Sequence, residues 1–170
     1  MKELTGSQSE GNLEEAFAGE SQANRRYLAF AKKAEAEGYP QVAKLFRAAA
    51  EAETVHALAH LRVMGGVGST AENLRDAIRG ETYEFKTMYP AMIAQAEEEG
   101  FKKVQRSFDY ANQVEETHAG LFQRALDGLD KELEPFDYYV CPVCGNTVEG
   151  EAPEVCPICR APGDRFIRVE

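Results

Sequence analysis

The sequence predicts an all-α four-helix bundle followed by a small, mainly β metal-binding domain. Three observations predict it: a long stretch of helix-forming residues, an internal repeat within that stretch, and four cysteines confined to the last 30 residues. Residues 8–129 are rich in Ala, Glu, Gln, Leu, Arg and Lys, whereas residues 135–170 hold five of the seven prolines. We therefore assign residues 1–130 to the bundle, residues 131–136 to a linker and residues 137–170 to the second domain.

The boundaries of the helices follow from glycines and capping residues. Asn12 and Ser69 are each followed by a glutamate three residues later, which is the spacing of a capping box at a helix start. Gly38 and Gly100 each end an Ala- and Glu-rich stretch, as glycine commonly does at a helix C-terminus. The expected helices span roughly residues 9–37, 40–64, 71–99 and 101–128.

The helical region contains an internal repeat. A shift of 62 residues places residues 34–57 on residues 96–119. The region is therefore interpreted as two copies of a helical hairpin, and the second helix of each copy carries Glu-x-x-His. The matched pairs are Gly38 and Gly100, Val42 and Val104, Phe46 and Phe108, Ala49 and Ala111, Glu53 and Glu115, His56 and His118, Ala57 and Ala119, and Tyr27 and Tyr89.

Each expected helix carries acidic or imidazole side chains in the middle of its apolar stripe. At about 1.5 Å per residue, these groups lie at similar depth along the four helices. Several carboxylates buried together without cations would each cost several kcal/mol or remain protonated, and two multivalent metal ions remove that cost. The residues are Glu20, Glu53, His56, Glu81, Glu84, Glu115 and His118.

The spacing of these residues indicates a two-metal site. One Glu from each of two helices, with Glu-x-x-His from each of the other two, is the di-iron or di-manganese pattern of helical bundles. Oxygen and imidazole ligands suit iron or manganese better than zinc or copper. The alternative is that these side chains are solvated; it fits a single Glu-x-x-His but not two at equivalent repeat positions. Tyr27 and Tyr89 are either hydrogen-bond partners of the ligand carboxylates or ordinary core residues.

The four cysteines form two Cys-Pro-x-Cys pairs, Cys141 with Cys144 and Cys156 with Cys159, separated by eleven residues. Two such loops facing each other hold one tetrahedral metal ion, zinc or iron, and the spacing alone does not choose between them. Disulfides are the alternative, which a cytosolic compartment disfavours. The neighbouring bundle favours iron, because a redox-active metal pair needs an electron source.

Charge and hydropathy exclude several classes of partner. Acidic residues outnumber basic ones by 10, which argues against binding to nucleic acid or to an anionic membrane surface. No apolar run approaches the roughly 20 residues that span a bilayer. The N-terminal residues also lack the apolar core of a signal peptide. We therefore expect a cytoplasmic protein with no nucleic-acid or membrane partner.

Over nearly its full length the chain resembles the rubrerythrin family, which joins a ferritin-like di-iron bundle to a rubredoxin-like domain. The motifs that carry the resemblance are AGESQAN at residues 18–24, ETVH at 53–56, GETYE at 80–84 with MYP at 88–90, EETH at 115–118, and the four cysteines. The resemblance implies an oxidoreductase of oxidative stress, a peroxidase that reduces hydrogen peroxide to water. It also implies two iron ions in the bundle and one iron bound by the four cysteines. Electrons would arrive through the cysteine-bound iron from an external donor such as a rubredoxin or its NADH-dependent reductase.

The resemblance also implies individual roles. Tyr27, Tyr89 or a bound water are candidate proton sources. Arg160 stands where glycine is common, and a positive φ there would cost roughly 1–2 kcal/mol. Asn146 stands where an aromatic often shields the iron, so we expect a more exposed cysteine site. The implied ligand roles are bridging for Glu53 and Glu115, terminal for Glu20 and Glu81, binding to one iron for His118, and exchange of Glu84 for His56 on the other iron upon reduction.

The link between the hairpins predicts a dimer. A ferritin-like bundle needs its second and third helices to run the same way, which requires a crossover of about 30 Å. Residues 65–70 reach at most about 20 Å. We therefore expect a homodimer in which the two hairpins around each metal pair come from different chains. Two rival functions remain open: a ferroxidase or iron-handling protein, and a zinc-ribbon binding module on a structural bundle.

Overall fold

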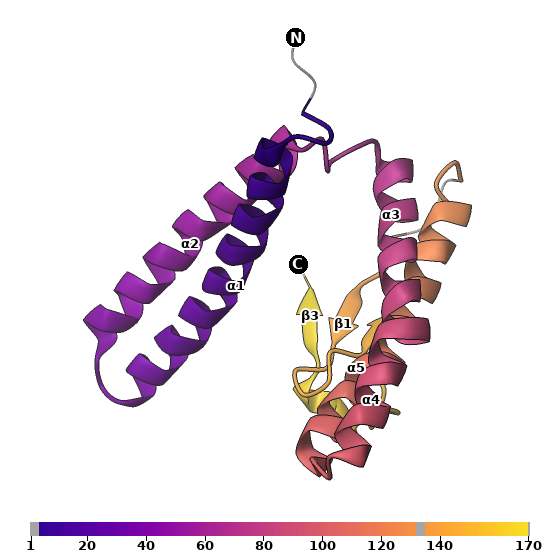
Figure 1. The fold of residues 1–170 in the computed structure, drawn as a ribbon. Coiled ribbons are helices and arrows are strands. Elements are labelled where there is room, and N and C mark those ends of the chain that lie inside the picture. The colour runs from indigo at the N-terminus through magenta and orange to yellow at the C-terminus, as the bar shows by residue number, and fades with distance from the viewer. Residues whose placement is uncertain (1–3, 132–134, 170) are drawn as a thin grey trace. The chain divides into compact units, whose positions relative to one another are not determined.

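The structure is a computed structural model that describes residues 4–131 and 135–169. The chain divides into two compact units, Met1–Gly68 and Ser69–Glu170. Figure 1 labels the helices and strands of both units. Among the described residues, no helix combines the length and the hydropathy needed to cross a membrane.

The first unit is a hairpin of two long helices, α1 (Gln8–Ala36) and α2 (Pro40–Val63). Gly38 makes the turn between them with φ +81°, a conformation open to glycine at no steric cost. The expected N-cap Asn12 is wrong, because the Ser7 side chain accepts a hydrogen bond from the Glu10 backbone N–H and α1 begins earlier. Asn12 lies inside the helix.

Small side chains allow the two helices of the first unit to approach closely. The Asn24 side chain, on α1, donates hydrogen bonds to the Ala50 carbonyl at 2.6 Å and to the Thr54 hydroxyl at 2.9 Å, both on α2. These bonds fix how α1 and α2 align along their length. The alanines buried between the helices are Ala31, Ala34, Ala43, Ala50 and Ala57.

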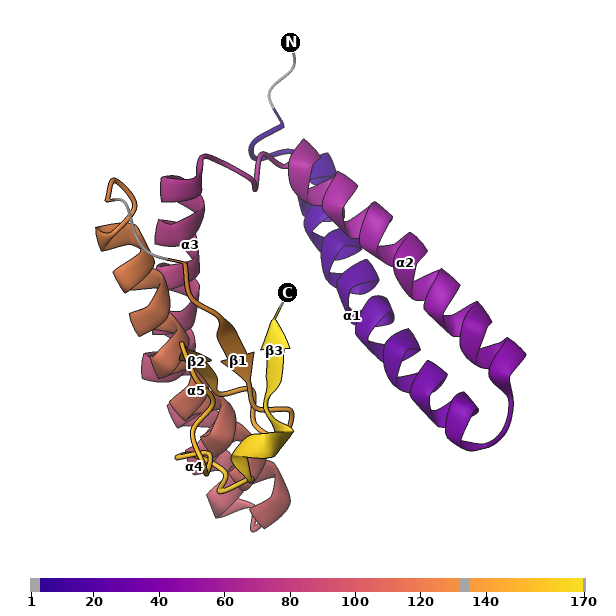
Figure 2. The same ribbon diagram turned by 180° about the vertical axis from the view of Figure 1, so that it is seen from behind.

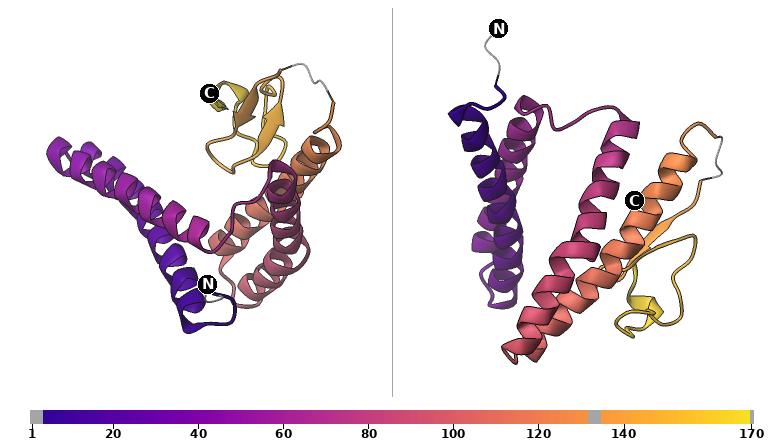
Figure 3. Two further views of the ribbon diagram at one scale, coloured as in Figure 1. Left: turned by 90° about the horizontal axis from the view of Figure 1, so that it is seen from above. Right: turned by 45° about the vertical axis from the view of Figure 1, so that its right-hand side comes forward.

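The second unit begins with α3 (Thr70–Tyr83), the π-helical segment η1 (Glu84–Met88) and α4 (Tyr89–Glu98), which pack along α5 (Lys102–Asp127) (Figure 3). The capping box at Ser69 is confirmed. The single helix expected over residues 71–99 is instead interrupted by η1. Pro90 has no N–H to donate and its ring crowds the preceding turn, so the helix widens there and the Tyr89 N–H bonds to the Glu84 carbonyl.

The chain ends in a small antiparallel sheet. Its strands are β1 (Tyr138–Val140), β2 (Thr147–Glu149) and β3 (Ile167–Val169), in the order β2-β1-β3, with the short 3-10 helix η2 (Gly163–Arg165) before β3. The edge strand β2 contacts α5 (Figure 2). Of the expected linker 131–136, residues 132–134 lie outside the described residues. Long helices followed by a small sheet confirm the expected fold class.

Candidate metal centres

The first hairpin brings one histidine and two carboxylates together. Glu20 comes from α1, and Glu53 and His56 come from α2, where a spacing of three residues puts both on one helix face. The His56 Nδ1 atom lies 3.0 Å from Glu53 Oε2 and 4.0 Å from Glu20 Oε1. One ligand atom from each residue lies within 4.8 Å of the others, the spacing of a metal site. The His56 side chain is 56% exposed, so this cluster is open on one side.

The second unit repeats this arrangement with Glu81, Glu115 and His118. Glu81 comes from α3, and the other two residues come from α5. The His118 Nδ1 atom lies 2.7 Å from Glu115 Oε2 and 4.0 Å from Glu81 Oε1, and again one ligand atom from each residue lies within 4.8 Å of the others. The internal repeat is therefore reproduced in three dimensions.

The two predicted tyrosines occupy equivalent places. The Tyr27 ring lies 6.1 Å from the Phe46 ring, and the Tyr89 ring lies 6.1 Å from the Phe108 ring. Burial raises the pKa of Tyr89, and the nearby charges of Glu84 and of the second cluster raise it further. Tyr89 therefore keeps its proton beside the carboxylates.

Glu84 lies at the start of η1 and interacts electrostatically with Glu115 and His118 of the second cluster. Burial raises its pKa, the negative charge of Glu115 raises it further, and His118 opposes this effect. Burial together with the charge and hydrogen bond of Glu115 raises the pKa of Glu81 to about 7. Carboxylates that repel one another in this way are the donor set that a multivalent cation stabilises, so these residues fit a bound metal.

The four cysteines gather into one cluster between the two loops. Their Sγ atoms lie within 4.8 Å of one another, and Sγ···Sγ is 3.6 Å for Cys141 with Cys159 and for Cys144 with Cys156. Tetrahedral coordination at a metal–sulfur distance of about 2.3 Å places sulfurs about 3.8 Å apart, so the cluster fits one ion. All four cysteines are free, which contradicts the disulfide alternative.

Backbone hydrogen bonds lower the pKa of one thiol of the cluster, Cys141, whereas burial raises the pKa of the Cys144 and Cys159 thiols. Burial raises the pKa of the Cys141 thiol, but the N–H groups of Cys144 and Val143 and the neighbouring thiols outweigh it and lower the pKa to about 7. Arg160 has φ +65°, which confirms the strained position expected after the fourth cysteine. Asn146 is itself 3% exposed, while Cys141 and Cys156 are buried and Cys144 and Cys159 are partly exposed. The expected greater openness of the site stays a prediction.

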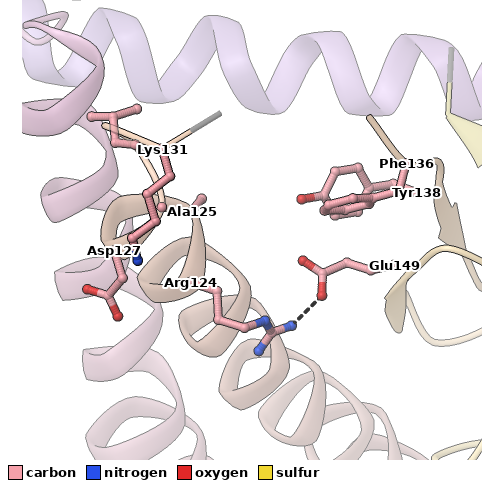
Figure 4. Close-up of a pocket in the computed structure, with 9 residues that line it drawn as sticks. Arg124, Ala125, Asp127, Lys131, Phe136, Tyr138 and Glu149 are labelled. Carbon is pink, nitrogen blue, oxygen red and sulfur yellow. Dashed lines mark hydrogen bonds and ion pairs between the residues drawn. The ribbon is translucent and has the colours of Figure 1, made fainter. Parts of the chain in front are cut away.

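Two contacts that the sequence did not predict join the sheet to α5. The His118 Nε2 atom lies 3.0 Å from the Thr147 hydroxyl, which donates to the Gly145 carbonyl at 3.1 Å. Arg124 on α5 also pairs with Glu149 on β2 at 2.8 Å, at the edge of a cavity that Figure 4 shows. Neither contact has a sequence signal, because a threonine and a surface ion pair in a strand carry no metal-site spacing.

Comparisons with known proteins agree with this geometry. The rubrerythrin family model matches residues 11–126, and the model for the rubredoxin-like domain of rubrerythrins matches residues 139–167. The chain is 40% identical over 170 residues to rubrerythrin-2 of Clostridium acetobutylicum, covering 91% of this chain and 92% of the relative. It is 37% identical to nigerythrin of Nitratidesulfovibrio vulgaris, covering 91% and 83%. Among solved structures, partially reduced nigerythrin superposes with a TM-score of 0.59 at 34% identity, covering 98% of this chain and 91% of the other.

Proposed function

We propose that this chain, which belongs to the rubrerythrin family, is a peroxidase that reduces hydrogen peroxide to water with electrons delivered through its rubredoxin-like centre. Its cofactors are two iron ions in the carboxylate–histidine site and one iron bound by the four cysteines. The observation that carries the proposal is the presence, in one chain, of two Glu-Glu-His clusters and a four-thiol cluster. A ferroxidase has no need of the thiol centre.

The ligands that we propose for the iron pair are those of the two clusters, with Glu84 beside the second. His56 and His118 each turn Nδ1 toward two carboxylates, so this nitrogen would bind a cation held among them. We propose bridging roles for Glu53 and Glu115. The proposed ligands are Glu20, Glu53, His56, Glu81, Glu84, Glu115 and His118.

Reduction of one peroxide to two waters consumes two electrons and two protons. Iron held by these carboxylates and histidines would supply the two electrons that reduction of the oxygen–oxygen bond needs. The chain supplies position and protons: Tyr89 holds its proton beside the carboxylates of the second cluster, and Tyr27 occupies the equivalent place in the first hairpin. We therefore propose these hydroxyls as proton donors.

We further propose a homodimer in which each iron pair takes one hairpin from each chain. Residues 64–69 alone connect α2 to α3, which is too short to run back along a helix of 24 residues. The first hairpin also leaves apolar side chains exposed for a second copy: Leu28, Phe30, Val42, Leu45, Val55 and Leu58. The four free cysteines suit a reducing compartment, so we propose the cytoplasm.

Light scattering of the iron-loaded protein tests the proposed exchange of hairpins between two chains. We expect a dimer mass with iron at both kinds of site, and a monomer mass when about fifteen glycine and serine residues are inserted within residues 64–69. A monomer with a complete iron pair and the natural connection would contradict hairpin exchange, as would an inserted variant that stays dimeric.

Peroxide turnover tests the function. With NADH, a rubredoxin and its reductase, we expect one NADH oxidised per peroxide and no net iron deposition. A Cys141→Ser, Cys144→Ser variant is the control: chemically reduced, it should consume one peroxide per iron pair and then stop, because electrons no longer reach the site. Oxidation of added ferrous iron with growing iron content, and no NADH-linked turnover, would instead support the iron-handling alternative.

A further inference from the structure

We propose that Thr147, on β2 of the rubredoxin-like domain, is a positioning residue for the iron site on α5. Its hydroxyl contacts the remote ring nitrogen of His118, Nε2, and holds the ring with Nδ1 turned toward the metal site. The inference rests on the proposed role of His118 as a ligand, and it does not depend on which oxidant the protein uses.

The Thr147 hydroxyl contacts the ring nitrogen of His118 that is remote from the carboxylates. The hydroxyl oxygen lies 3.0 Å from His118 Nε2, and the hydroxyl donates its own hydrogen to the Gly145 carbonyl at 3.1 Å. A neutral imidazole that binds a metal ion through Nδ1 carries its single N–H on Nε2. In the metal-bound protein the hydroxyl oxygen would therefore accept a hydrogen bond from Nε2.

The other ring nitrogen faces the proposed iron site. His118 Nδ1 lies 2.7 Å from Glu115 Oε2 and 4.0 Å from Glu81 Oε1. A metal-binding histidine generally donates its remote N–H to an oxygen acceptor that fixes the ring orientation and raises the ligand's basicity. Thr147 is that acceptor here, and it comes from the other domain of the chain.

The Thr147 hydroxyl is held rigidly enough to act in this way. Thr147 pairs with Val140 in the sheet, and its own hydrogen bond to Gly145 fixes its side-chain rotamer. The strand is docked on α5 by the Arg124–Glu149 ion pair, and a Cβ at Gly145 would meet the Val114 side chain of α5 at 3.7 Å, so the loop before β2 also lies close to α5. The position of the hydroxyl therefore follows from the docking of β2 rather than from a free loop.

The hydroxyl also lines a cavity of about 490 Å³ beside His118 and Glu81. A smaller residue at position 147 would leave room for a water molecule that could replace the hydroxyl. The informative pair is therefore Thr147→Val, which keeps the β-branched shape and removes the acceptor, and Thr147→Ser, which keeps the acceptor.

The first measurement reads the Nε2–H of His118 directly. In the full-length protein with one zinc per chain in the four-cysteine site and added Zn²⁺ in the carboxylate–histidine site, long-range proton–nitrogen NMR spectra detect this hydrogen and its rate of exchange with water. We expect slow exchange in the natural protein and in Thr147→Ser, and faster exchange in Thr147→Val. An unchanged exchange rate in Thr147→Val would overturn the proposal.

The second measurement is the affinity of the carboxylate–histidine site for Co²⁺. It uses proteins that hold zinc in the four-cysteine site only, and binding is followed by the visible absorption of the bound Co²⁺. Loss of an outer partner of a ligand histidine typically weakens binding by about 10- to 100-fold. We expect a loss of about tenfold in Thr147→Val and less than about twofold in Thr147→Ser. Equal losses in both variants would refute a role for the hydroxyl.

Glu149→Gln separates the hydroxyl from the docking of the strand. This variant breaks the ion pair with Arg124 and leaves Thr147 in place. We expect the natural exchange rate of the Nε2–H and the natural Co²⁺ affinity. If Glu149→Gln reproduces the Thr147→Val losses, the docked strand rather than the hydroxyl matters and the proposal is wrong. Neither measurement uses peroxide, so the proposed peroxidase function can fail without affecting the outcome.

Discussion

Substituting Glu81 with Gln should change how the free energy of unfolding depends on pH when the carboxylate–histidine site holds no metal. The Glu81 side chain is 22% exposed and lies beside Glu115 and Glu84. Burial and the charge of Glu115 raise its pKa from the ordinary 4.5 to about 7. Glutamine is nearly isosteric with glutamate and has no proton to lose.

The sign follows from comparing the folded and unfolded chains. Between pH 4.5 and about 7 the folded chain retains a proton on Glu81 that the unfolded chain has lost. Stability therefore falls as the pH rises through this window, because the folded state binds more protons. The full difference corresponds to roughly 3 kcal/mol, most of which lies between pH 5 and pH 8.

The assay is urea unfolding followed by helical circular dichroism at pH 5 and pH 8, with iron kept in the cysteine site and the carboxylate site free of metal. The unfolding free energy of Glu81→Gln should rise relative to the natural protein by roughly 2–3 kcal/mol between the two pH values. Glu116→Gln, an exposed change on α5, is the matched control and should show no such trend. The reasoning is refuted if the difference between Glu81→Gln and the natural protein is the same at both pH values.

Three further predictions concern single contacts. Arg160→Gly removes the strain of a positive φ and should stabilise the cysteine module by about 1 kcal/mol, seen as a higher temperature for loss of the ferric–thiolate absorption; an unchanged temperature contradicts it. Cys144→Ser should abolish that absorption while leaving the helical circular dichroism nearly intact, and retained colour would show that the site does not need this sulfur. Asn24→Ala loses the hydrogen bonds to Ala50 and Thr54 and should destabilise the first hairpin by about 1–2 kcal/mol in urea unfolding. A loss below about 0.3 kcal/mol would mean that these bonds do not hold the two helices in register.

Local spacing was sufficient to predict both clusters of candidate ligands. Residues three apart on a helix share one face, so Glu53 with His56 and Glu115 with His118 follow from the helix period alone. The repeat of 62 residues then required two similar hairpins, and the structure has them. The Cys-Pro-x-Cys loops are equally local.

The interruption of the third helix was harder to foresee. Pro90 was visible in the sequence, but a proline can bend, end or widen a helix, and the choice depends on what packs against it. Packing along α5 keeps the chain helical through η1. The wider π-helical turn changes the direction in which side chains project from Glu84 onward.

The sequence by itself determined the helical hairpins, their Glu-x-x-His motifs and the thiol cluster, because each depends on residues a few positions apart or on a repeat. Only the tertiary structure decided that the edge strand β2 of the sheet meets α5, and hence that Thr147 reaches His118 across 29 positions of chain. Such a contact depends on how two separately folded surfaces dock, and the energy of docking is spread over many weak interactions that leave no pattern in the order of residues.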